Sequence, residues 1–166
     1  MFLSAEEKVQ EKKEYQLHPK GIFRAVCVDV VTHKRDGTPY QSLDGTKNQL
    51  ALVFQTERKM EPEEEGGEER HFTKWEYFNI PESIKNEKAK LNEFLTAWEV
   101  PIKAYQTMED FEEAVIGRPA NLVITHKPGK EGKTYVNIDS CTAVEDASQA
   151  FVAQGYTRFH DQKGPF

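Results

Sequence analysis

Residues 21–33 form a run in which both alternating sets of side chains are apolar. One set comprises Ile22, Val26, Val28 and Val30, and the other comprises Phe23, Ala25, Cys27 and Val31. A strand with only one buried face needs only one apolar set. Two such sets fit a long, curved strand that bends through a barrel core. This run therefore constrains the architecture more than any other part of the sequence.

Four more segments have the character of strands. They lie at 48–58, 70–79, 119–126 and 133–144, and Gly, Pro and Asp residues stand between the segments. The first of them alternates clearly, with Leu50, Leu52 and Phe54 on one face. The connections after the first, second and fourth strands are compatible with antiparallel hairpins. Five strands in this order can close into a small barrel that hides its edges.

The spacing of apolar residues changes between the third and fourth strands. Leu91, Phe94, Leu95 and Trp98 recur at helical spacing, which predicts an amphipathic helix over 86–99. A second helix is expected over 107–116, with Thr107 as its N-cap and Gly117 at its end. The length of 166 residues fits one domain with tails. We expect a polar extension at 1–18, the folded domain at 19–144 and a C-terminal tail at 145–166.

The net charge is −6, and it is unevenly distributed. Residues 57–70 hold seven Glu against three basic residues, so four of the six net negative charges lie in that segment. The balance argues against tight, non-specific duplex binding but leaves room for a local basic groove. No segment approaches the roughly 18 apolar residues of a membrane helix, and residues 1–13 lack the apolar run of a signal peptide. Together with Cys27 and Cys141, expected as buried reduced thiols, these features favour the cytosol.

Several short segments together resemble a known family. They are Gly21–Val26 in the first strand, Gln49–Phe54 in the second, Lys90–Leu95 on the helix, Ile116–Ala120 before the fourth strand and Tyr135–Ile138 in the fifth. In this pattern, residues 19–144 resemble the phage single-stranded DNA-binding proteins of the OB-fold family. The resemblance implies a mainly β chain: a five-stranded OB-fold barrel with a helical insertion between strands 3 and 4. It also implies single-stranded DNA binding in phage DNA replication or recombination, which places the protein in the cytoplasm of a bacterial host. We expect no cofactor.

Binding single strands without sequence preference requires rings on which bases stack and cations that follow the phosphates. OB barrels present both on the face of strands 2 and 3 and in the loops 1–2 and 4–5. In the segment 70–79, Phe72, Phe78 and Ile80 make the better inner row, which favours Trp75 and Tyr77 as the outward stacking pair. The other candidate binding residues are His71 and Lys74 on this strand, Lys34, Arg35, Tyr40 and Lys47 in the first loop, and Lys127, Lys130, Lys133 and Tyr135 around the second.

The C-terminal tail offers two further hypotheses. Bacterial single-stranded DNA-binding proteins end in an acidic tail that closes on Pro-Phe and docks partner proteins, and this chain ends in Pro165-Phe166. That similarity makes Phe166 a candidate contact for phage or host replication or recombination proteins. Residues 160–164 do not form an acidic run, however, which favours chance or packing against the barrel instead. The tail aromatics Phe151, Tyr156 and Phe159 either support a homodimer or cover the barrel.

The sequence contains no catalytic signature. The five histidines are scattered, and there is no metal-binding pair of histidines, CxxC motif or phosphate-binding loop. We therefore expect no catalytic residues and no metal. Two alternatives to DNA binding remain open: an OB-fold adaptor or inhibitor that contacts proteins through an apolar face, and a nuclease-like enzyme whose carboxylates converge in space.

Overall fold

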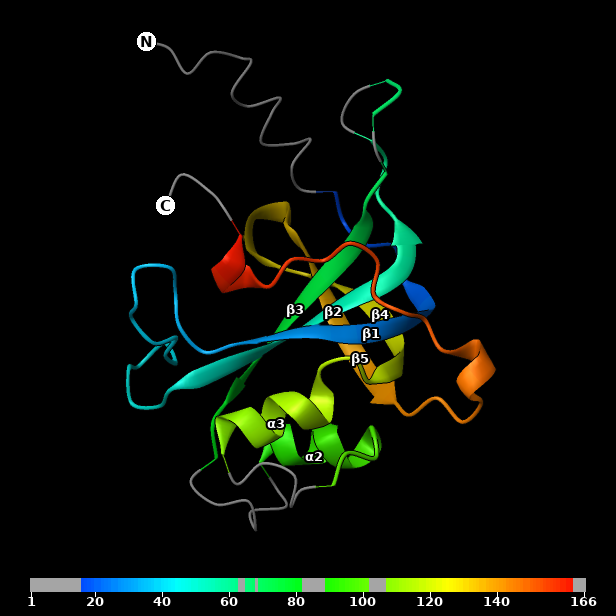
Figure 1. Cartoon of the computed structure of the whole chain (residues 1–166). Coiled ribbons are helices and arrows are strands. Elements are labelled where there is room, and N and C mark those ends of the chain that lie inside the picture. The colour runs from blue at the N-terminus through cyan, green and yellow to red at the C-terminus, as the bar shows by residue number, and fades with distance from the viewer. Residues whose placement is uncertain (1–15, 63–64, 68, 82–88, 102–106, 163–166) are drawn as a thin grey trace.

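One five-stranded antiparallel sheet forms the centre of the computed structural model, which describes residues 16–62, 65–67, 69–81, 89–101 and 107–162 (Figure 1). The strands are β1 (Gly21–Val31), β2 (Gln49–Lys59), β3 (His71–Asn79), β4 (Pro119–Pro128) and β5 (Thr134–Thr142). Their spatial order is β3-β2-β1-β4-β5, so β1 is central and β3 and β5 are the edges of an open sheet. All five strands expected from the sequence are confirmed, with closely similar bounds.

The central strand β1 is buried on both of its faces, as its two apolar alternations predict. Every residue from Ala25 to Val31 is buried. The pairing register with β2 shifts between Cys27 and Asp29, which marks a bulge. A bulge bends a strand and increases its twist. β1 pairs with β4 through residues 21–26 and with β2 through residues 25–31, so it joins the two halves of the sheet.

In the described part of the connection between β3 and β4 there are two helices, which confirms the expected helical insertion. α2 comprises Lys90–Ala97 and α3 comprises Met108–Val115. The expected N-cap is present, because the Thr107 hydroxyl accepts a hydrogen bond of 3.1 Å from the backbone N–H of Asp110. α2 is shorter than the predicted helix 86–99, of which residues 86–88 lie outside the described part. None of the described helices has both the length and the apolar character needed to cross a membrane.

The larger apolar core lies between the sheet and the helices, and we call it the inner cluster. Its largest fully buried side chains are Trp98, Phe54, Phe111, Leu52, Leu91, Leu95, Leu122 and Ile124. The polar atom of the buried Trp98 ring has a hydrogen-bond partner, because the indole N–H donates to the Pro119 carbonyl at 2.8 Å. Cys27 and Cys141 belong to this cluster as buried free thiols, as expected. Burial raises the pKa of the Cys27 thiol to about 12.

A second apolar core, the outer cluster, lies on the opposite face of β1 and β2. It consists of Val26, Val28, Val31, Ala51 and Val53. Residues 150–162, which we call the strap, cross this face in extended form and in a short 3-10 turn at Phe159–Asp161 (Figure 1, orange to red). Phe151, Tyr156 and Phe159 of the strap pack against the outer cluster. These tail aromatics therefore cover the sheet, which is one of the two roles expected for them.

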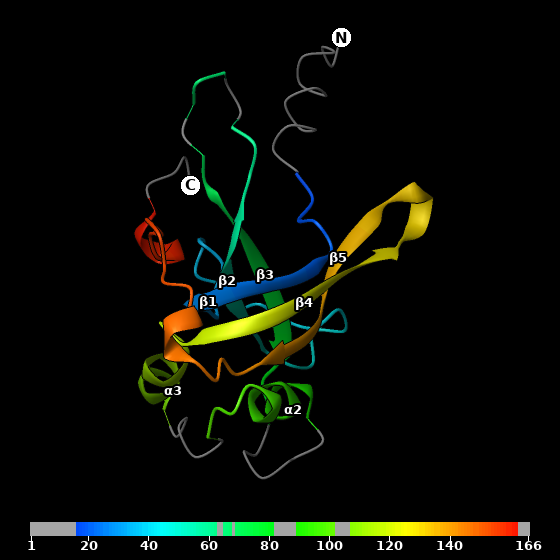
Figure 2. The same cartoon turned by 90° about the vertical axis from the view of Figure 1, so that its right-hand side faces the viewer.

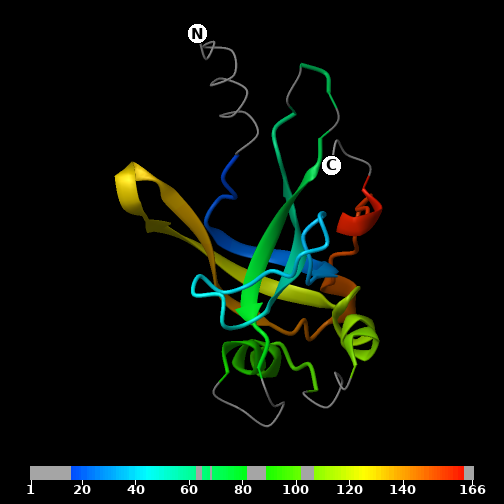
Figure 3. The same ribbon diagram turned by 90° about the vertical axis from the view of Figure 1, so that its left-hand side faces the viewer.

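The hairpin of β4 and β5 extends beyond the rest of the sheet, as Figures 2 and 3 show. β1 pairs with β4 only as far as the Gly21–Ile124 pair. From Thr125 to Asn137 the two strands pair only with each other, across a turn at residues 129–133. We call residues 125–137 the arm.

Candidate nucleic-acid interface

Alternation along β3 separates two sets of side chains. Phe72 and Phe78 are buried, each with 7% exposure, whereas Trp75 and Tyr77 lie on the face of the outer cluster. Ile80, expected with the inner row, follows β3 and is 37% exposed. The favoured stacking pair therefore stands on the face opposite to the two buried phenylalanines.

Trp75 and Tyr77 belong to a longer series of aromatic side chains, which we call the ring row. The ring centroids of Tyr40 and Tyr77 are 5.5 Å apart, those of Tyr77 and Trp75 are 6.2 Å apart, and those of Trp75 and Phe159 are 5.1 Å apart. Tyr77 is 45% exposed, while Trp75 is partly buried beneath the strap. The row thus combines an accessible ring with rings fixed by packing.

The β1–β2 loop brings Tyr40 and Arg35 to this row. Tyr40 is held between the strands, because its N–H donates to the Thr32 carbonyl and its carbonyl accepts from the Gln49 N–H. Arg35 lies in a tight turn, with its guanidinium carbon 4.6 Å from the centroid of the Phe159 ring. This distance is within the range of a cation–π contact. Two of the candidates from this loop therefore meet the candidates from β3.

The other two basic candidates of this loop, Lys34 and Lys47, are exposed. The second turn of the loop is built around the Asp44 carboxylate, which accepts from the Ser42 hydroxyl and from the Thr46 hydroxyl and N–H. These hydrogen bonds lower the pKa of Asp44 to about 2. The loop thus carries negative as well as positive charge. Among its three basic candidates, Arg35 is the one whose contact with the ring row is established.

Lys74 and His71 take positions that differ from those of the stacking pair. In the alternation along β3, Lys74 belongs to the same set of positions as the buried phenylalanines. Its ammonium lies 3.9 Å from the Glu76 carboxylate. Burial raises the pKa of Glu76, against the opposing effect of Lys74 and Lys90. His71 donates from Nδ1 to the Thr56 carbonyl at 2.9 Å, and its ring centroid lies 5.1 Å from that of Phe151 in the strap. Both side chains are therefore engaged within the protein.

The arm carries the remaining candidates. Lys127, Lys130, Lys133 and Tyr135 are all exposed. The Tyr135 ring lies directly over Gly129, where an added Cβ would approach a ring carbon to 1.9 Å. The absence of a side chain at position 129 therefore makes room for the ring against the turn. The tip of the hairpin presents three cations, one aromatic ring and a single carboxylate, that of Glu131.

The strap is the part of this site that the sequence left undefined. Its central attachment is Asp29 of β1, whose side chain is 2% exposed. The carboxylate accepts from the Tyr156 hydroxyl at 3.1 Å, from Arg158 Nε at 2.5 Å and from the Phe159 N–H at 2.7 Å. A carboxylate within the apolar run 21–33, with no nearby sequence partner, is the signal that could have indicated this attachment.

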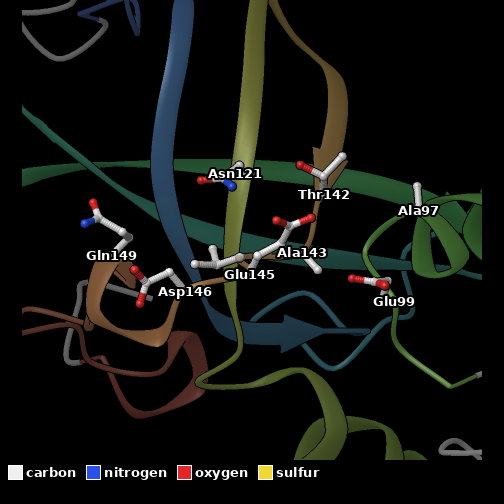
Figure 4. Close-up of a pocket in the computed structure, with 9 residues that line it drawn as sticks. Ala97, Glu99, Asn121, Thr142, Ala143, Glu145, Asp146 and Gln149 are labelled. Atoms are coloured by element: carbon white, nitrogen blue, oxygen red, sulfur yellow. The ribbon is translucent and has the colours of Figure 1, made fainter.

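A separate, shallow pocket of about 570 Å³ lies between the end of α2 and the segment after β5 (Figure 4). The carboxylates of Glu99, Glu145 and Asp146 stand around it. The Asp146 carboxylate is already engaged, because it accepts from the N–H and the hydroxyl of Ser148. Within the described residues, no group of three or more His, Cys, Asp or Glu side chains is arranged to hold a metal ion.

Phe166, the candidate partner contact, lies outside the described residues. Comparisons of the chain with protein-family models, with curated proteins and with solved structures give no match. Any functional assignment therefore rests on the residues and geometry of this chain.

Proposed function

We propose that this protein binds single-stranded DNA, with little sequence preference, on an OB-type barrel. The strand order supports this fold, with β1 at the centre and β3 and β5 at the edges. α2 packs against both edge strands and so spans the side on which such a barrel closes. OB barrels bind oligonucleotides on the face of strands 2 and 3 and in the loops 1–2 and 4–5. The ring row on β3 and the arm between β4 and β5 correspond to these places in strand order, which supports the proposal.

The observation that carries the proposal is the ring row beside Arg35. Consecutive rings from Tyr40 to Phe159 have centroids between 5.1 and 6.2 Å apart, and the Arg35 guanidinium lies against the last of them. Bases stack on rings such as those of Tyr77 and Trp75 whatever the identity of the base, because every base has a π-face. A guanidinium at the end of the row suits the accompanying phosphates. The arrangement therefore fits a single strand better than a duplex, whose bases are already stacked on one another.

The arm adds the electrostatic part of the proposal. Its three lysines and Glu131 give it a local positive charge, although the chain as a whole carries −6. Phosphate contacts respond to local charge, since screening limits their range to about 8–10 Å at ordinary ionic strength. We propose that the arm contacts the backbone of the strand and that Tyr135 offers one further stacking surface. Following the family resemblance, we place this activity in phage DNA replication or recombination in the bacterial cytoplasm.

Fluorescence anisotropy with labelled oligo-dT and a duplex control, at about 50 and 200 mM salt, tests the proposal. Tyr77→Ala is the informative variant, because Tyr77 is the most exposed ring of the β3 pair. We expect it to weaken oligo-dT binding about 5- to 150-fold, which corresponds to the 1–3 kcal/mol of one stacked base. Ile22→Ala, at a 76% exposed apolar residue outside the ring row, is the matched control and should leave binding unchanged.

Three results are informative. Salt-sensitive preference for oligo-dT that falls in Tyr77→Ala alone supports the proposal. Binding that is equally weakened by the control would move the site away from the ring row. Absence of binding by the folded wild type at low salt would defeat the proposal, and the half-exposed ring row would then be the surface to test as a protein contact.

A further inference from the structure

The strap is fastened to the sheet by more than apolar packing. Asp29 is buried, and Tyr156, Arg158 and Phe159 all donate hydrogen bonds to its carboxylate. Arg158 also lies 3.5 Å from Glu112 of α3. Withdrawing the strap would leave a buried carboxylate without these donors and would expose the valines of the outer cluster, both of which are costly. The strap is therefore a fixed layer of the fold.

The end of this fixed layer reaches the cation of the β1–β2 loop. The Phe159 ring faces the Arg35 guanidinium at 4.6 Å and also contacts Trp75. Three residues later, Gln162 Oε1 accepts a hydrogen bond of 2.9 Å from Arg35 Nη2. The strap thus links a residue of the loop to the ring row on β3. Loop and strap are 127 residues apart at this hydrogen bond.

We propose that Phe159 and Gln162 position Arg35 for the phosphate of a nucleotide stacked on the ring row. The inference rests on the proposed function and adds to it that the binding surface is composite and incomplete without the C-terminal strap. An arginine has several flexible torsions, and holding it in one place before binding lowers the entropic cost of using it. The Phe159 ring lies against the guanidinium, and the amide oxygen of Gln162 holds its Nη2. Phe159 and Gln162 are positioning residues, and Arg35 makes the contact.

Phe159→Leu and Phe159→Tyr separate positioning from packing. Leucine keeps an apolar side chain against Trp75 but removes the π-face, whereas tyrosine keeps that face. We expect Phe159→Leu to weaken oligo-dT binding about 3- to 10-fold and Phe159→Tyr to bind like the wild type. If Arg35 loses its phosphate contact, the slope of log affinity against log salt becomes shallower by about 0.7. A purely structural role would not produce this change in slope.

Gln162→Ala tests the same contact without touching the apolar packing. We expect a loss of about 2- to 5-fold, from one charge-assisted hydrogen bond. Val152→Ala, at a 67% exposed position of the strap, is the matched control and should bind like the wild type. Limited proteolysis of each variant establishes that the strap remains in place.

A double-mutant cycle with Arg35→Ala decides whether these residues act through Arg35. We expect Arg35→Ala combined with Phe159→Leu to bind no more weakly than Arg35→Ala alone. Additive losses would overturn the positioning role, and tighter binding by Phe159→Leu would show that the strap competes with DNA. Absence of binding by the wild type itself would defeat the proposed function and this inference with it, so the two failures are distinguishable.

Discussion

The two faces of the sheet are covered from solvent in different ways. The inner cluster is filled by large side chains, such as Trp98 and Phe54, and is covered by two helices. The outer cluster consists of four valines and an alanine, and it is covered by the strap, which has no helix or strand longer than one short turn. The inner face therefore depends mainly on apolar burial. The cover of the outer face combines three aromatic side chains with hydrogen bonds, of which the largest group converges on the Asp29 carboxylate.

This difference has a consequence for function. The face that we propose for DNA has the smaller core of the two, and its cover is a single extended segment rather than two helices. Regions of lower local stability are common in ligand-binding surfaces. We therefore expect damage to the inner face to unfold the whole protein, and damage to the Asp29 attachment to change the outer face alone.

The largest effect is expected from Trp98→Ala. Trp98 is fully buried, and its ring centroid lies 5.3 Å from that of Phe54. Truncation leaves a cavity and an unpaired Pro119 carbonyl, so we expect a loss of about 3–5 kcal/mol in the free energy of unfolding. Urea denaturation followed by circular dichroism measures this loss. The exposed Val152→Ala serves as its control, and a loss below about 1 kcal/mol would contradict the assigned importance of the inner cluster.

A smaller and more local effect is expected from Asp29→Asn. The amide has one acceptor oxygen in place of two and no charge for Arg158, so we expect a loss of about 1–3 kcal/mol that falls on the attachment of the strap. The chain has two tryptophans, one on each face. In a Trp98→Phe background the fluorescence of Trp75 should shift to the red, and in a Trp75→Phe background that of Trp98 should not.

Asp139→Asn, at an exposed position of β5, is the matched control for this substitution. It should leave both tryptophan signals unchanged. If Asp29→Asn shifts the signals of Trp75 and Trp98 together, the two faces unfold as one unit and the comparison between them fails.

Much of the fold could be predicted from the sequence because local patterns determine it. The double alternation of β1, the helical spacing of Leu91, Leu95 and Trp98, and the cap at Thr107 all appear where they were expected. Ile80 shows the limit of such patterns. Alternation assigns it to the inner row, but it follows the last residue of β3 and is 37% exposed.

The candidate site could be predicted only in part. Alternation on β3 separated Trp75 and Tyr77 from the buried phenylalanines, but it could not show that a strap covers part of that face. The bonds from Tyr156, Arg158 and Phe159 to Asp29 span between 127 and 130 residues. No local periodicity links positions so far apart, so the composite nature of the surface became visible only in three dimensions.

The smallest effect on stability is expected from acidification. It should act through His18, whose ring lies beside Phe23 and Phe72. His18 is buried; its Nδ1 donates to the Pro19 carbonyl at 2.8 Å, and its Nε2 lies 2.6 Å from the Thr56 hydroxyl. Burial lowers the pKa of His18 below its ordinary value of 6.5. The bond to Pro19 raises this pKa, and the electrostatic influence of Arg58, His126 and Lys74 lowers it further. The unfolded chain therefore takes up a proton near pH 6.5 while the folded protein still resists it.

The stability contributed by neutral His18 is complete above pH 6.5 and falls as the pH decreases below that value. Between about pH 7.5 and pH 5.5, the Tm of the wild type should thus fall further than the Tm of His18→Gln, which cannot take up the proton. His160→Gln, at an exposed histidine of the strap, controls for general charge effects. Its Tm should fall by as much as that of the wild type. Equal decreases in wild type and His18→Gln would show that the sensitivity to acid lies elsewhere. If the strap became protease-sensitive at low pH before the inner face lost its Trp98 signal, the acid-sensitive element would belong to the outer face instead.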